Sequence, residues 1–222
     1  MSDYAEYTII LYEEDILQIK EIFEISLNII FFHRYLGNNE YQDVQSKINK
    51  ISYVKVKNEK LSKDIDKIIN QIEKNFENNT QYGQLFSLKF YEKEKNKKNL
   101  KYPWEIWNFI LILSRTDDVK DKKVINNKKE TYEDDGNKEN KIREYIFKII
   151  EKLNDKENYM PNINLDDKSL NEESFFYDKT IENISTKDDY FSLFSNYLKK
   201  KTRKYYSYQS FTIIIIHFLR II

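Results

Sequence analysis

The sequence of 222 residues contains no cysteine, three glycines, two prolines and two histidines. The lack of cysteine excludes disulfides, thiolate metal sites and a cysteine nucleophile. The histidines, His33 and His217, are far apart in the sequence and do not form a paired metal-binding motif. We therefore expect each to be an ordinary core or surface residue, and we expect no metal site.

Motifs for enzymatic chemistry are also missing from the sequence. It contains no glycine-rich phosphate loop, no nucleophile elbow and no kinase signature. The acidic run Glu133-Asp134-Asp135 does not have the spacing to Gly136 that a calcium-binding EF-hand loop requires. We expect no catalytic residues and no cofactor. The alternative, an enzyme with an unfamiliar site, would require a deep pocket lined by convergent carboxylates.

Charge and targeting signals give a similar picture. Lysine plus arginine and aspartate plus glutamate both number 37, so no net field attracts the chain to nucleic acid or to anionic lipid. The first residues lack the basic and apolar regions of a signal peptide. No apolar run is long and uncharged enough to cross a membrane. These features predict a cytoplasmic protein without a transmembrane segment.

Hydrophobic periodicity predicts three helices. The segment Ile16–Leu36 is apolar around most of a helical wheel, which is typical of a helix buried on nearly every side. Between Leu61 and Phe76, apolar residues recur at spacings of three and four, and Asn58 is a plausible N-cap for this helix. The segment Ile142–Leu153 has the same amphipathic pattern.

Strands are predicted in four other segments. Ile51–Lys57 is rich in β-branched residues, and Phe86, Leu88 and Phe90 alternate with polar residues. Trp104–Leu113 is apolar on both faces and should be a central strand, which would form an antiparallel hairpin with the Phe86 strand across the lysine-rich loop 93–101. The β-branched tail Phe211–Leu219 is predicted to be a buried strand.

The remaining segments suggest one domain, residues 1–222, with two interruptions. Residues 117–140 are almost entirely polar and predict a disordered insert, and residues 162–174 form a polar linker. The segment that follows this linker has no pattern from which we can assign an element.

Both tryptophans and one proline lie together in the segment Tyr102–Trp107. Pro103 suits the first position of a strand, because proline cannot donate to a ladder of hydrogen bonds. We expect Trp104 and Trp107 to be structural core residues that point to opposite faces of that strand, since side chains alternate along a strand. Aromatic residues at the mouth of a loop also suit a protein interface.

Several short motifs together resemble the family of autophagy-related protein 101. They follow one another in the order and approximate spacing of that family, over roughly Ile16–Pro161 apart from the insert. The Pro-Trp-Glu-x-Trp block is the most specific of them. The motifs are Phe31–Gly37, Tyr53–Val56, Leu88–Tyr91, Pro103–Trp107 and Glu157–Pro161.

The resemblance implies a single HORMA domain of α+β class, with a small, mainly antiparallel sheet and three helices packed on one face. It also implies a non-enzymatic subunit of the autophagy-initiating kinase complex, which pairs with the HORMA domain of autophagy-related protein 13 at the phagophore assembly site. A HORMA protein that captures a peptide with its C-terminal segment, as checkpoint and repair members do, is the alternative.

One departure from the family concerns the loop before the Pro-Trp-Glu block. Family members typically present a Trp-Pro-Phe finger there, whereas this loop contains no tryptophan or phenylalanine. Leu100 and Tyr102 are its only large apolar or aromatic side chains, so we predict that they bind a recruited partner if the loop retains that role. The rival interpretation is that the finger function is lost and Tyr102 only caps the strand.

Overall fold

The computed structural model describes residues 4–13, 15–35, 40–46, 48, 51–77, 82–92, 103–113, 135–155, 175–186, 188–193 and 195–196. This part of the chain forms six strands and three long helices. In chain order they are β1 (Ala5–Glu13), α1 (Ile16–Arg34), β2 (Tyr41–Gln45), β3 (Ser52–Val56), α2 (Glu59–Glu77), β4 (Gly83–Glu92), β5 (Glu105–Leu113), α3 (Asp135–Leu153) and β6 (Phe175–Ile184).

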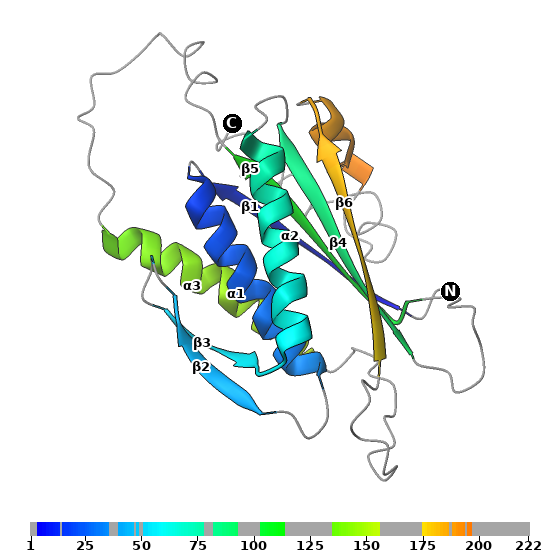
Figure 1. The fold of residues 1–222 in the computed structure, drawn as a ribbon. Coiled ribbons are helices and arrows are strands. Elements are labelled where there is room, and N and C mark those ends of the chain that lie inside the picture. The colour runs from blue at the N-terminus through cyan, green and yellow to red at the C-terminus, as the bar shows by residue number, and fades with distance from the viewer. Residues whose placement is uncertain are drawn as a thin grey trace.

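Four strands form the main sheet, in the order β1-β5-β4-β6, and β2 pairs with β3 in a separate two-stranded sheet. The β1–β5 pair is parallel, whereas β4 is antiparallel to both β5 and β6, and β2 is antiparallel to β3. The three long helices lie on one face of the main sheet, and the β2–β3 hairpin lies beside α1 (Figure 1). The predicted α+β class is confirmed, and the arrangement is consistent with a HORMA-like fold.

The main core lies between the helices and the inner face of the sheet. Its centre is Phe23 of α1, whose ring meets Phe86 of β4 and Phe109 of β5 edge-on, with centroids 5.0 and 5.1 Å apart. Residues two apart on a strand share one face, so Trp107 and Leu111 join Phe109 in this core. The central position of β5 explains why its sequence is so apolar.

The three predicted helices are confirmed, with small differences at their ends. The predicted cap of α2 is also confirmed, because Asn58 Oδ1 accepts a hydrogen bond of 2.9 Å from the Leu61 backbone N–H. The segment predicted as Ile142–Leu153 begins earlier, at Asp135, so residues 135–140 belong to α3 and not to the expected insert. Polar side chains hid this first part of the helix, because they leave no apolar stripe.

Strands β3, β4 and β5 and the β4–β5 antiparallel hairpin agree with the sequence predictions. Gly83 begins β4 where the backbone of β5 approaches closely, since a Cβ at this position would lie 2.6 Å from the Leu111 carbonyl oxygen. Strands β1, β2 and β6 were not predicted from the sequence. The loop 93–102, residues 117–134, the linker 162–174 and the tail Phe211–Leu219 lie outside the described residues.

The outer face of the sheet carries a smaller apolar cluster at one end. Tyr190, from the short helix 188–193 after β6, packs there against Ile110 and Ile112 of β5 and Ile184 of β6. Thr186 and Asp189 hold the start of this helix through reciprocal bonds, with Asp189 N–H donating to Thr186 Oγ1 at 3.1 Å. The segment after β6 is therefore anchored on the back of the sheet.

Candidate interaction surface

A buried ion pair joins the end of α1 to the start of β5. Arg34 Nε lies 2.6 Å from Glu105 Oε2, and Arg34 Nη2 lies 2.8 Å from Glu105 Oε1. Both side chains are at least nine-tenths buried, and the guanidinium carbon lies 5.8 Å from the centroid of the Trp104 ring. This two-bond geometry is the strong form of an arginine–carboxylate contact. It fixes the position of α1 relative to the central strand.

Trp104 and Trp107 are core residues, as predicted, but their expected placement on opposite faces is wrong. Both belong to the core on the helix side of the sheet, because Trp104 precedes the first residue of β5 and packs on Phe90. The Trp104 backbone continues the ladder, donating to the Phe90 carbonyl and accepting from the Ala5 N–H. Pro103 lies just before this junction and is half-buried. These residues stabilise the fold and do not form an exposed site.

Tyr7 links this cluster to α3. Its ring lies 4.5 Å from that of Trp107, and Lys152 Nζ lies 5.5 Å from the centroid of the Tyr7 ring. Burial raises the pKa of the Tyr7 phenol, and the charge of Glu105 raises it further. The phenol therefore stays protonated, and the contact with Lys152 holds the end of α3 against the sheet.

The outward face of α3 carries the most exposed large apolar side chain in the described part of the chain, Phe147, which is 65% exposed. Its neighbours on the same face are also exposed and polar. We call five exposed residues the α3 stripe. They are Asn140, Arg143, Phe147 and Glu151 of α3 and Asn154, which directly follows α3 and still bonds to the Ile150 carbonyl as a helical residue would. An exposed phenylalanine with polar neighbours is typical of an interaction site and not of a helix that only covers a core.

The β2–β3 hairpin is fastened to α1 by glutamate side chains. Glu21 Oε1 accepts a bond of 2.8 Å from the Ile48 backbone N–H, and the Tyr53 hydroxyl donates to Glu24 Oε1 at 3.4 Å. Burial raises the pKa of Tyr53, and Glu24 raises it further, so this donor keeps its proton. Ile48 is itself 46% exposed, so its side chain remains accessible although its backbone is bonded to α1.

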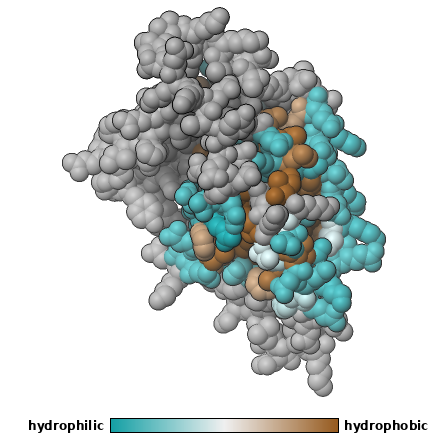
Figure 2. All heavy atoms as spheres, turned by 90° about the vertical axis from the view of Figure 1, so that its left-hand side faces the viewer, coloured by the Kyte–Doolittle hydropathy of each residue, from teal (hydrophilic) through white to brown (hydrophobic). Residues whose placement is uncertain are grey.

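Leu17 adds a second exposed apolar side chain near Ile48. It lies one turn before Glu21 on the same face of α1, and it is 50% exposed. We group Leu17, Ile48 and the α3 stripe under the name candidate interaction surface. Figure 2 shows the side of the molecule that carries α3 and the hairpin, where hydrophobic residues form an interrupted strip between hydrophilic ones.

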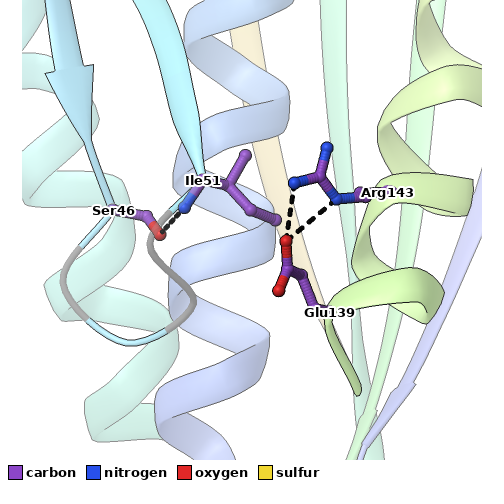
Figure 3. Close-up of polar contacts among 4 residues, drawn as sticks. All are labelled: Ser46, Ile51, Glu139 and Arg143. Carbon is purple, nitrogen blue, oxygen red and sulfur yellow. Dashed lines mark hydrogen bonds and ion pairs between the residues drawn. The ribbon is translucent and has the colours of Figure 1, made fainter. Parts of the chain in front are cut away.

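One end of the hairpin, at Ser46 and Ile51, faces the first half of α3 (Figure 3). Ser46 Oγ accepts a bond of 3.0 Å from the Ile51 N–H, which joins the ends of the two strands, and the Ile51 side chain points toward the Glu139–Arg143 pair of α3. The hairpin is therefore bonded to α1 and lies next to α3.

Leu100 and Tyr102, the residues predicted to bind a recruited partner, lie outside the described residues. Among the residues that are described, no group of histidine, aspartate and glutamate side chains could hold a metal ion. No described helix is both long and apolar enough to span a membrane. His33 is half-buried at the end of α1, where burial and the neighbouring Arg34 charge lower its pKa.

Comparison with known proteins identifies the family. Residues 13–167 match the family described as Autophagy-related protein 101. The chain belongs to the autophagy-related protein 101 family. It is also similar to an Autophagy-related protein 101 from Arabidopsis thaliana, with 27% identity over 166 residues, which covers 68% of this chain and 77% of that protein.

The family match includes the buried ion pair and α3, and it ends before β6 begins at Phe175. Arg34 and Glu105 lie in two different motifs of the resemblance, so the structure joins those motifs directly. The candidate interaction surface was not found by sequence reasoning. One signal was present, because Phe147 falls off the apolar stripe formed by Ile142, Ile149 and Leu153.

Proposed function

We propose that this chain is a non-enzymatic scaffold or adaptor subunit of the autophagy-initiating kinase complex, and that it acts by pairing its HORMA domain with that of autophagy-related protein 13. Membership of the autophagy-related protein 101 family makes it an autophagy protein. The observation that carries the pairing is the exposure of Phe147 at the centre of the α3 stripe. A central aromatic side chain that a partner can bury is the usual source of binding energy in a protein interface.

The contacts of the buried polar residues support a scaffold function, because they join one element of the fold to another. Arg34 and Glu105 join α1 to β5, and Gln84 Nε2 donates to the Ile72 carbonyl at 2.9 Å, which joins β4 to α2. Tyr177 of β6 donates to Asp64 of α2 at 3.1 Å. These groups hold elements together, and we assign none of them to chemistry.

In this proposal the chain reaches membranes through its partners, at the phagophore assembly site. The candidate interaction surface holds the partner HORMA domain, and the loop with Leu100 and Tyr102 contacts a recruited factor. The two roles use different parts of the chain, so they are separable by mutation.

The alternative function, peptide capture by a mobile C-terminal segment, has less support. The first part of that segment is anchored on the outer face of the sheet through Tyr190, which is 2% exposed, and through the Thr186–Asp189 bonds. Capturing a peptide by rearranging this part of the segment would require breaking those contacts. An anchored segment favours the scaffold.

Co-expression of the full chain with the partner HORMA domain tests the proposal. We expect a one-to-one complex by light scattering, and we expect Phe147→Asp to abolish it without lowering the melting temperature, because Phe147 is exposed. Phe191→Asp is the matched control, since Phe191 is 41% exposed in the helix on the opposite face of the sheet. If the wild-type chain does not bind, or if Phe147→Asp binds as wild type does, the proposal is wrong.

A further inference from the structure

The α3 stripe has a symmetric order of side chains about Phe147. Arg143 and Glu151 are each four positions away from it, and Asn140 and Asn154 are each seven positions away. With 3.6 residues per turn, all four lie within about 40° of Phe147 around the helix axis. All five side chains are exposed. The stripe therefore carries opposite charges at equal distances on the two sides of one aromatic side chain.

This order is self-complementary when two copies of the helix lie antiparallel. In a two-fold symmetric pair, a residue that precedes Phe147 meets the residue that follows it by the same number of positions on the other copy. Phe147 then packs on Phe147, Arg143 faces Glu151, and Asn140 faces Asn154. Each polar contact occurs twice, and no like charges of the stripe face each other.

Arg143 has the capacity for such a second contact. In the isolated chain its Nε and Nη2 both contact Glu139 Oε1, at 3.1 and 2.6 Å. A guanidinium carries five N–H donors, so the bonds to Glu139 leave donors for another carboxylate. Glu151 of a second copy would supply that carboxylate from across the interface.

We propose that two copies of this chain form an antiparallel homodimer through the α3 stripe, with Phe147 on the two-fold axis. The stripe extends over about four helical turns, so the interface is small and the dimer is weak and concentration-dependent. The homodimer uses the same Phe147 as the pairing with autophagy-related protein 13. If that proposed function holds, the two assemblies exclude each other, and self-association limits the amount of chain that is available to the partner.

Sedimentation of the full-length chain over a range of concentrations tests the homodimer without any partner. We expect a monomer–dimer equilibrium for the wild type and a monomer for Phe147→Asp. Arg143→Glu and Glu151→Arg should each weaken the dimer at least about tenfold, because each places two like-charged contacts in the two-fold interface. The double variant Arg143→Glu/Glu151→Arg should recover the dimer, since the charges are exchanged but still complementary.

The control is Lys63→Glu, which changes an exposed charge on a different helix, α2, and should leave the equilibrium unchanged. Circular dichroism confirms that each variant is folded. The homodimer is refuted if the wild type is monomeric throughout, if the dimer persists in Phe147→Asp, or if the double variant is no better than the single ones. In a separate experiment the partner HORMA domain is added to the chain, which tests the proposed function alone. If the chain forms the homodimer but does not bind the partner, only the proposed function is contradicted.

Discussion

Arg34 and Glu105 form a buried pair with two hydrogen bonds, of 2.6 and 2.8 Å, although 71 positions separate them in the sequence. The pair joins the Phe-Phe-His-Arg-Tyr-Leu-Gly motif at the end of α1 to the Pro-Trp-Glu-x-Trp motif that begins β5. Neither motif indicates by itself that it contacts the other. The contact gives both motifs a structural role, since together they hold the end of the core helix against the start of the central strand.

Breaking this pair on one side should destabilise the fold. We expect Glu105→Gln or Arg34→Met to lower the free energy of unfolding by about 3–5 kcal/mol, because a buried charge is then left without its partner. The double variant Arg34→Met/Glu105→Leu should be much closer to wild type, since no buried charge remains. Urea unfolding measures the difference. Lys63→Ala, which breaks an exposed pair with Glu59, is the control and should change stability by less than about 1 kcal/mol.

The two tryptophans should affect stability strongly. We expect Trp107→Ala to lower the free energy of unfolding by about 3–5 kcal/mol, because this ring is fully buried in the main core. Trp107→Phe should cost much less, since it keeps an aromatic ring and removes an indole N–H that finds no hydrogen-bond partner among the described residues. Thermal unfolding checks both. Charge reversals within residues 117–134 are the comparison and should stay within about 0.5 kcal/mol of wild type; a similar loss there would contradict the prediction.

The bond between Tyr177 and Asp64 should make stability depend on pH. Partial burial acts to raise the pKa of Asp64, but the Tyr177 hydrogen bond and the charges of Lys179 and Lys67 outweigh it, so the folded pKa is below the ordinary value of 3.8. A carboxyl with a depressed folded pKa contributes stability above its unfolded pKa and loses this contribution as the pH falls through the folded pKa.

The stability gap between wild type and Asp64→Asn should therefore be largest near neutral pH and should shrink below pH 3.8. Chemical unfolding at neutral and at acidic pH measures the gap. Tyr177→Phe removes one of the interactions that lower the pKa and should reduce the pH dependence of the gap. A gap that is the same at both pH values would show that Asp64 is not stabilised as a carboxylate.

The loop before β5 supplies a prediction that separates recruitment from pairing. Leu100→Asp combined with Tyr102→Ala should leave the complex with the partner HORMA domain intact and reduce recruitment to autophagic membranes. The expected reason is that these two side chains are the only large apolar or aromatic groups the loop offers to a partner. Fluorescence microscopy of tagged variants in cells measures recruitment, and co-purification measures pairing. Unchanged recruitment would mean that the finger function is lost.

Sequence periodicity predicted the elements whose apolar residues repeat regularly. The three helices and strands β3, β4 and β5 were found because helix and strand burial leave periods of about 3.6 and 2 residues in the sequence. Asn58 was found as a cap because its side chain acts locally, on an N–H three residues away. Strand β1 was missed because most of its positions are half-exposed and do not alternate regularly over its full length, and β2 was missed because four of its five residues are exposed.

The sequence by itself determined the fold class, the family and the core character of Trp104 and Trp107, since these follow from composition, local pattern and motif order. Only the tertiary structure decided which surfaces remain available to partners. Phe147 is one of several apolar residues on α3, and its exposure depends on which face of α3 packs against α1 and β1. The pairing of Arg34 with Glu105 likewise depends on the approach of distant segments, which no local interaction in the sequence specifies.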